Sequence, residues 1–201
     1  MKTQKKKPYI IGVTGYSGSG KSEFCKFLSE LDSRVYVIEL EELSRQVIYE
    51  NREKFIQLLG EKVFKPNGSF DYNYYCTCDE DKTTLSRSWR VPKMLEKFYE
   101  EVDKASVSHD VIVVNMVSLP RTQIWRECDK RVKIESNEKQ RHEKLRIRRF
   151  DNCPQPGQAQ SRDEQVERSW GTIGDDFQTV FNDYSANFKL EAVKLLDTVI
   201  K

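Results

Sequence analysis

The eight residues from 15 to 22, which read GYSGSGKS, constrain the fold of this chain more than any other segment. Its three glycines are separated by a tyrosine and two serines, and a lysine and a serine close the segment. A loop of this composition turns successive backbone N–H groups inward around an anion, because glycine reaches the required torsions at little steric cost. The pattern therefore predicts a phosphate-binding loop between a strand and a helix.

Both flanks of this segment have the properties that such a loop requires. Residues 9–14, YIIGVT, form a short apolar run rich in β-branched side chains, which predicts a buried strand. Apolar residues recur at helical spacing from Glu23 to Leu31, which predicts a helix with one face on a sheet. The positive end of that helix dipole would point at the phosphates. A glycine-rich turn without a ligand is the alternative interpretation.

The polar residues of the loop have predicted tasks. We expect Lys21 to place its ammonium group against the β- and γ-phosphates of a nucleotide. We expect the Ser22 hydroxyl to ligate a Mg²⁺ ion that keeps several waters. The residues predicted to hold the phosphates are Gly15, Ser17, Gly18, Ser19, Gly20, Lys21, Ser22 and Glu23.

Further strands alternate with helices along the chain. Apolar runs predict strands at 35–38, 111–114 and, more weakly, 131–134. Helical spacing is found over 43–59, with an interruption near 50–51, and over 91–107, with Pro92 near the start. This alternation predicts an α/β fold of three layers, with a mostly parallel central sheet covered by helices on both faces.

Length and composition limit the alternatives. A chain of 201 residues fits a single domain over residues 1–201. The 34 basic and 32 acidic residues give a net charge of +2, which favours neither nucleic acid nor a membrane surface as a partner. We expect a cytoplasmic protein, because the sequence has neither a signal-peptide core nor an apolar run near the roughly 20 residues that span a bilayer. Five scattered cysteines do not suggest a disulfide framework, and the sequence carries no signal for an oligomeric state.

A basic helical stretch follows the last predicted strand. Its cations are Arg141, Lys144, Arg146, Arg148 and Arg149. The segment 152–158, NCPQPGQ, breaks helical structure directly afterwards. Residues 138–170 are therefore predicted to form a helical lid, with a plain surface loop and a solvated basic face as the alternatives.

Two charged residues near the second predicted strand are candidates for binding an acceptor substrate. Glu39 follows that strand directly, and ligands in open α/β sheets bind beyond the carboxyl ends of strands. Arg45 lies in the helical stretch that comes next. The alternatives are that Glu39 caps this helix and that Arg45 pairs with Glu41 or Glu42 on the surface.

In their order along the chain, these segments resemble the dephospho-coenzyme A kinase family of P-loop kinases. The resemblance rests on residues 11–22, on 37–41 followed by 44–47, and on 66–70, with weaker matches at 138–140, 161–166 and 181–182. It implies that ATP and Mg²⁺ are used to phosphorylate the ribose 3′-hydroxyl of dephospho-coenzyme A, the last step of coenzyme A biosynthesis. By the same resemblance, Glu39 is the base for that hydroxyl and Arg45 lies near an anionic part of the acceptor. Arg148, with Lys144 as a further candidate, acts on the transferring phosphoryl group.

The chain departs from this family at four places. The family usually has Asp where this chain has Glu39, His where it has Val91, and Arg near the position of Tyr72. Residues 115–120, NMVSLP, contain no acid for a second Mg²⁺ contact. Two other interpretations stay open: a kinase of nucleoside or deoxynucleoside monophosphates, and a module that binds ATP without transferring phosphate.

Overall fold

The computed structural model describes residues 7–148, 163, 166–167, 170 and 176–200, except for the side chains of residues 76 and 146–148. Its strands are β1 (Tyr9–Gly15), β2 (Val35–Glu39), β3 (Val111–Asn115), β4 (Lys130–Ser136) and β5 (Gln178–Asn182). Its helices are α1 (Lys21–Leu31), α2 (Leu40–Glu50), α3 (Arg52–Leu59), α4 (Tyr72–Thr77), α5 (Glu80–Ala105), α6 (Gln123–Glu127), α7 (Glu138–Arg148) and α9 (Asn187–Val199). Two short 3₁₀ helices, η1 (Glu61–Val63) and η2 (Leu119–Arg121), complete the described elements.

The strands form one five-stranded sheet in the order β2-β3-β1-β4-β5. β1 lies between β3 and β4 and runs parallel to both, and β5 runs parallel to β4. β1 and β3 are rich in Ile and Val and are buried along almost their whole length, as parallel strands covered on both faces must be. The predicted α/β fold with a mostly parallel sheet is confirmed.

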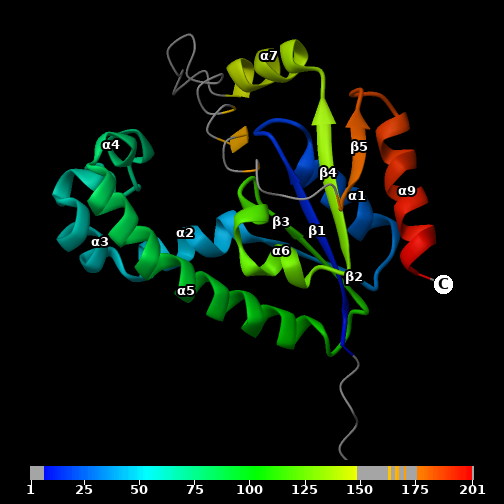
Figure 1. Ribbon diagram of the computed structural model, residues 1–201, viewed down its shortest axis with the longest axis horizontal. Coiled ribbons are helices and arrows are strands. Elements are labelled where there is room, and N and C mark those ends of the chain that lie inside the picture. The colour runs from blue at the N-terminus through cyan, green and yellow to red at the C-terminus, as the bar shows by residue number, and fades with distance from the viewer. Residues whose placement is uncertain (1–6, 149–162, 164–165, 168–169, 171–175, 201) are drawn as a thin grey trace, which may run out of the picture. The chain divides into compact units, whose positions relative to one another are not determined.

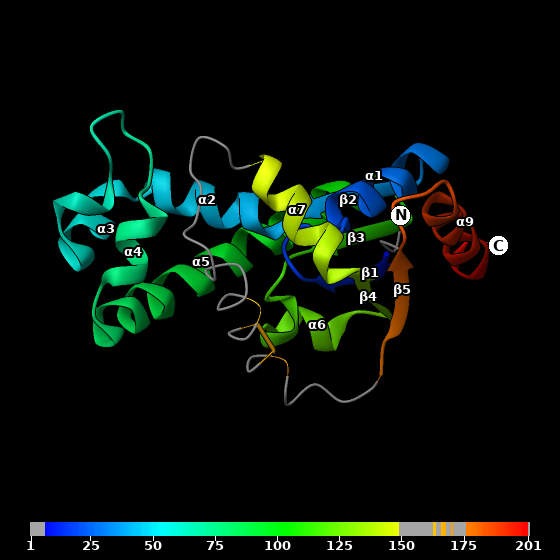
Figure 2. The ribbon, with the colours of Figure 1, turned by 90° about the horizontal axis from the view of Figure 1, so that it is seen from above.

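Helices cover both faces of this sheet (Figures 1 and 2). α1 and α9 lie against one face, and α6 lies on the other. Side chains alternate along β1: Ile11 and Val13 join the core under α1 and α9, while Gly12 faces Trp125 of α6. The sheet is therefore the middle of three layers.

By backbone contacts the chain divides into two compact units, residues 1–38 with 105–201 and residues 39–104. The sheet core described above belongs to the first unit. The second unit consists of α2 to α5 and η1 and has its own aromatic core, in which Phe55, Phe64, Phe70 and Tyr75 are buried. Rings such as those of Phe55 and Phe70 meet edge to face, at 6.1 Å between centroids.

Of two predicted boundaries between helical segments, one agrees with the structure and one differs. The predicted break in the helical stretch 43–59 is confirmed, since α2 ends at Glu50 and α3 begins at Arg52. The helix predicted from residue 91 instead begins at Glu80, so Pro92 lies inside α5 and not near its start. Although Pro92 lacks the N–H that would bond to the Ser88 carbonyl, the buried side chains of Ser86 and Phe98 hold the helix on both sides of it.

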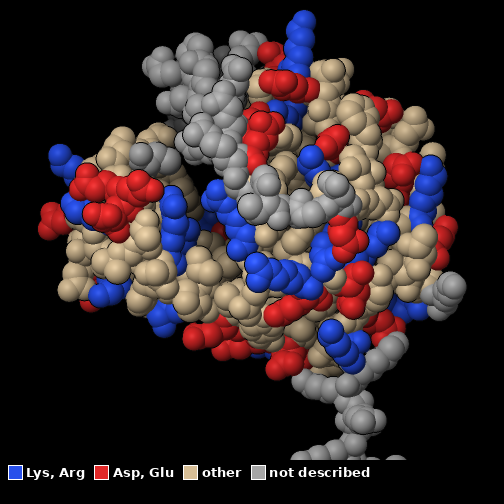
Figure 3. Space-filling model, in the orientation of Figure 1, with Lys and Arg blue, Asp and Glu red and all other residues tan. Residues whose placement is uncertain are grey.

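On the face that Figure 3 shows, acidic and basic side chains are interspersed. This agrees with the small net charge of the sequence. Among the described helices, none combines the length and the apolar character that a bilayer span requires.

Phe188 of α9 tests how the layer of α1 and α9 is held together. Its side chain is buried, and its ring lies 5.4 Å from that of Phe24 in α1. We expect Phe188→Ala to lower the free energy of unfolding by about 3–5 kcal/mol, because it leaves a cavity under α1. Urea denaturation measures this change.

Phe181→Ala is the matched control for this substitution. Phe181 lies on β5 with 55% of its surface exposed, so its removal is expected to change stability by no more than about 0.5 kcal/mol. Equal losses in the two variants would contradict the packing described here.

Candidate functional site

The glycine-rich segment follows β1 and leads directly into α1. α1 begins at Lys21, and its N-cap residue is Gly20, which has no side chain to cap the first turn. The first N–H groups of α1 therefore depend on other partners, and the positive end of the helix dipole lies at the loop. This is the strand–loop–helix arrangement that the sequence predicted.

At two positions of the loop, both the backbone φ angle and the space around the residue require glycine. Gly18 and Gly20 have φ angles of +80° and +100°, in the left-handed region that favours glycine. A Cβ atom on Gly18 would lie 2.8 Å from Leu145 Cγ of α7. A Cβ atom on Gly20 would overlap the side-chain amide of Asn182, at the end of β5. Other elements thus pack directly onto the loop backbone.

The lysine and serine side chains of the loop are placed differently. Lys21 is only 7% exposed, and its ammonium group donates to the Tyr16 carbonyl oxygen at 2.9 Å. Ser22 is exposed on the first turn of α1. Ser19 is fully buried, and among the described residues its hydroxyl has no hydrogen-bond partner. The loop thus offers backbone amides and the Lys21 ammonium group to a polyphosphate, and the exposed Ser22 hydroxyl to a Mg²⁺ ion.

Tyr16 connects the loop to three residues that follow α7. Its hydroxyl donates to Glu167 Oε1 at 2.5 Å, and its ring lies 4.9 Å from the ring of Trp170. Burial, and then the hydrogen bond to Glu167, raise the pKa of the Tyr16 hydroxyl. The guanidinium group of Arg141 lies 4.9 Å above the Tyr16 ring and forms an ion pair with Asp163.

The acceptor-side candidates Glu39 and Arg45 belong to the second unit. Glu39 is the last residue of β2 and the N-cap residue of α2, but its side chain makes no capping hydrogen bond. Arg45 is exposed on α2 and pairs with Glu42 at 3.3 Å, as the surface interpretation predicted. Within the same unit, burial raises the pKa of the Tyr72 hydroxyl, while the charge of Arg45 acts in the opposite direction.

The basic helix is α7. The structure describes the side chain of one of its two candidate cations but not that of the other. Lys144 places its ammonium group 3.8 Å above the ring of Tyr184, in the turn between β5 and α9. Arg148 is the last residue of α7, and its side chain lies outside the described part of the structure. Residues 149–162 of the predicted lid also lie outside it. The role of Arg148 therefore stays a prediction.

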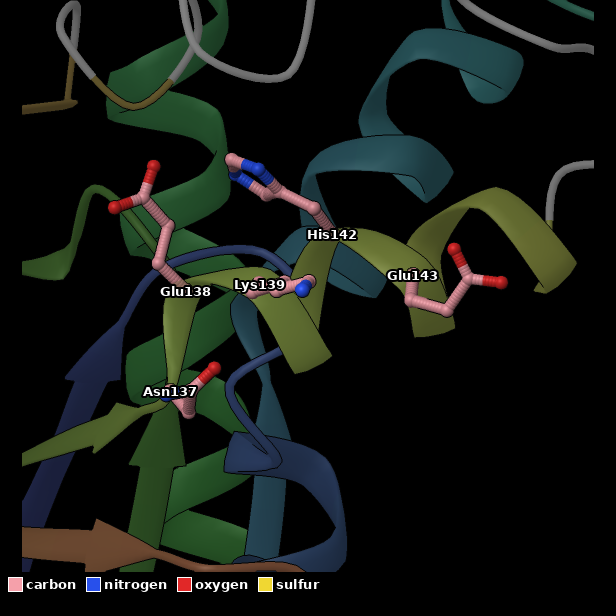
Figure 4. A pocket seen from close by; sticks show the side chains of 5 residues that line it. All are labelled: Asn137, Glu138, Lys139, His142 and Glu143. Atoms are coloured by element: carbon pink, nitrogen blue, oxygen red, sulfur yellow. The ribbon is translucent and has the colours of Figure 1, made fainter.

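A surface hollow of about 620 Å³ lies at the start of α7 (Figure 4). It is lined by Asn137, Glu138, Lys139, His142 and Glu143. Glu138 and His142 lie one helical turn apart and point the same way in Figure 4. We place the nucleotide site at the loop and not in this hollow, because the loop leads into the uncapped N-terminus of α1, whose first N–H groups lack intrahelical partners.

Sequence analysis missed three residues that touch the loop. Arg141 was grouped with the basic stretch without a role, Asn182 was noted only for the family resemblance, and Tyr184 was not singled out. The structure places a donor atom of each against a loop carbonyl oxygen. One local signal was present: the polar pair Asn182-Asp183 lies shortly before the final helix, which begins at Asn187.

Known proteins share both sequence and fold with this chain. No protein-family model matches the sequence. A dephospho-CoA kinase of Dehalococcoides mccartyi is 34% identical over 64 residues, which is 31% of this chain and 31% of that protein. A dephospho-CoA kinase of Fusobacterium nucleatum is 29% identical over 60% of this chain and 63% of that protein. The chain thus spans between about a third and two thirds of these curated relatives.

Solved structures agree with this fold over nearly the whole chain. A Thermus thermophilus protein named TT1252 superposes with a TM-score of 0.80 at 17% identity, covering 98% of this chain and all of that chain. Dephospho-CoA kinase from Campylobacter jejuni gives 0.59 at 17% identity, with 96% and 98% covered. Shikimate kinase from Bacteroides thetaiotaomicron gives 0.55 at 16%, again with 96% and 98% covered. The fold is that of P-loop kinases, and the resemblance to dephospho-CoA kinases is confirmed.

Gly20→Ala tests the close approach of Asn182 to the loop. The new methyl group would displace the Asn182 amide, so we expect the affinity for Mg²⁺-ATP to fall at least about tenfold, or 1.4 kcal/mol. Isothermal titration calorimetry measures it.

Gly68→Ala controls for backbone strain alone. Gly68 also has a left-handed φ of +84°, but its Cβ atom would meet only Arg52 Nη1, at an ordinary 3.7 Å. This variant is expected to lose about 1–2 kcal/mol of stability and no nucleotide affinity. A Gly20→Ala protein that binds ATP like the parent chain would refute the tight contact.

Proposed function

We propose that this relative of the dephospho-CoA kinases transfers the γ-phosphoryl group of ATP to the ribose 3′-hydroxyl of dephospho-CoA and so forms coenzyme A. The observation that carries the proposal is the glycine-rich loop between β1 and α1, with Lys21 at the helix start. The names of the sequence relatives supply the acceptor. We place the reaction in the cytoplasm, with a small molecule as substrate.

The loop binds the nucleotide. Backbone amides of residues 17–22 bind the phosphates, except that of Ser19, which donates to the Tyr16 carbonyl. Lys21 exchanges its bond to the same carbonyl for the β- and γ-phosphate oxygens. Ser22 supplies a hydroxyl ligand for Mg²⁺, which when bound neutralises charge on those oxygens. Since phosphoryl transfer depends mainly on positioning and charge stabilisation, these contacts supply most of the catalysis.

Glu39 acts on the acceptor. Its carboxylate accepts the proton of the ribose 3′-hydroxyl while the oxygen bonds to the γ-phosphorus and the bond to the ADP oxygen breaks. The position of Glu39 at the carboxyl end of β2 supports this role, because open α/β sheets bind ligands at that edge.

Arginines complete the proposed site. Arg45 binds an anionic group of the acceptor. Its present pair with Glu42 is exposed and contributes only about 0–1 kcal/mol, so a phosphate with two oxygens for one guanidinium group can replace it. Arg148 stabilises the charge on the transferring phosphoryl group, with Lys144 as the further candidate on the same helix.

The acceptor is tested by ADP release from ATP and Mg²⁺, with dephospho-CoA compared against a panel of nucleoside monophosphates. We expect turnover with dephospho-CoA alone. Lys21→Ala and Glu39→Gln are each expected to lower kcat at least about 100-fold. Lys21→Ala removes the positive charge that contacts the phosphates, and Glu39→Gln removes the proposed base. Glu53→Gln, an exposed acid on α3, is the control and should leave kcat unchanged.

Other results of this experiment would give the chain a different function or remove one residue from the proposed site. Turnover with a nucleoside monophosphate would make the protein a monophosphate kinase. ATP binding without turnover on any acceptor would leave a nucleotide-binding module. Full activity of Glu39→Gln with dephospho-CoA would keep the reaction and remove Glu39 as its base.

Removal of the divalent cation is a separate test. With excess EDTA we expect turnover to be abolished and to return on addition of MgCl₂, because the phosphate charge is then neutralised again. Turnover that persists in EDTA would contradict the role proposed for Ser22.

A further inference from the structure

Four consecutive carbonyl oxygens of the phosphate loop accept hydrogen bonds from side chains. The bonds run from Lys21 Nζ to Tyr16 O at 2.9 Å, from Arg141 Nη1 to Ser17 O at 3.2 Å, from Tyr184 Oη to Gly18 O at 3.3 Å and from Asn182 Nδ2 to Ser19 O at 2.9 Å. One donor belongs to α1, next to the loop. The other three come from α7 and from the end of β5 and the turn after it, more than 100 residues away in sequence.

Asn182 and Tyr184 support each other at the turn after β5. Asn182 is fully buried, and while its amide nitrogen donates to the loop, its Oδ1 accepts the backbone N–H of Tyr184 at 2.8 Å. Tyr184 has a φ of 59°, the only left-handed value of a residue other than glycine among the described residues. Such torsions are held where the surroundings over-determine them, and they cluster at functional sites.

Arg141 holds the loop from α7. Its side chain is 3% exposed, and it donates to both carboxylate oxygens of Asp163 in addition to Ser17 O. His142 Nε2 lies 3.0 Å from the same carboxylate. Because Asp163 compensates the buried charge, Arg141 acts here as a fixed hydrogen-bond donor for the loop backbone.

We infer that Arg141, Asn182 and Tyr184 are positioning residues for nucleotide binding, and we call them the carbonyl clamp. The C=O and N–H groups of a planar peptide unit point in opposite directions. Carbonyls held outward by the clamp therefore fix the following amides before the nucleotide arrives. Those of Gly18 and Gly20 turn toward the phosphates, and that of Ser19 closes the loop by donating to the Tyr16 carbonyl at 3.1 Å. The inference rests on the proposed function only in that the ligand of the loop is ATP.

Tyr184→Phe removes only the hydroxyl that donates to Gly18 O. Loss of one hydrogen bond of this kind should weaken Mg²⁺-ATP binding about fivefold, measured by isothermal titration calorimetry. Urea unfolding of the free protein should change no more than in Tyr74→Phe, which also loses one hydroxyl-to-carbonyl hydrogen bond. Tyr74→Phe is the matched control, since Tyr74 Oη donates to the Leu59 carbonyl at 3.4 Å, away from the loop; its ATP affinity should equal that of the parent chain.

Asn182→Asp is the second variant. It keeps the oxygen that accepts Tyr184 N–H and replaces the donor to Ser19 O by an oxygen, so ATP binding should weaken more than in Tyr184→Phe. If this variant does not fold, Tyr184→Phe still decides. Parent-like ATP affinity in folded Tyr184→Phe would overturn the clamp.

Hydrogen exchange of the free chain separates failure of the clamp from failure of the proposed function. Without nucleotide, amides 17–22 should exchange faster in Tyr184→Phe than in Tyr74→Phe, because the clamp orders the loop in the free protein. A parent chain that binds no ATP would refute the proposed function, and the exchange rates would still test the clamp. Equal exchange rates of amides 17–22 in the two variants would overturn the carbonyl clamp.

Discussion

The hydrogen bond from Asn182 to the Ser19 carbonyl is the contact on which the site depends most directly. It places β5, the last strand, beneath the loop that follows the first strand, and it requires Gly20 because no side chain fits against the Asn182 amide. β4 lies between β1 and β5, and its Ile134 carbonyl lies against Gly15 in the same way. The geometry of the loop is therefore a product of the whole parallel sheet and not of the local sequence alone.

Charge compensation explains how basic residues approach a loop that must itself attract anions. Arg141 is buried with Asp163, and Lys144 lies over the aromatic face of Tyr184. A cation with a fixed partner is oriented without adding a free charge, and the face of an aromatic ring attracts a cation. Lys21 donates to the neutral Tyr16 carbonyl, a bond that it can exchange for one to a charged phosphate oxygen.

Much of the fold was predictable because its signals are local. The Ile- and Val-rich runs of β1 and β3 identified central strands, and Asn51 marked the break between α2 and α3. β5 was not predicted, because only Val180 and Asn182 of its five residues are buried and the strand has little apolar character. The predicted start of α5 was wrong, because Pro92 was interpreted as a residue of the first helical turn. In the structure the helix continues on both sides of Pro92, and the side chain of Phe98 beyond it is buried.

The sequence by itself identified the candidate phosphate loop, since glycines at 15, 18 and 20 allow the torsions of such a turn and Lys21 and Ser22 supply the chemistry. It also identified Glu39, at the end of β2, and Arg45, in the helix that follows, as candidates for binding the acceptor. Only the tertiary structure decided which side chains hold the loop carbonyls. Arg141, Asn182 and Tyr184 lie more than 100 residues from the loop, and their contacts arise from strand order and helix packing, which no local pattern encodes.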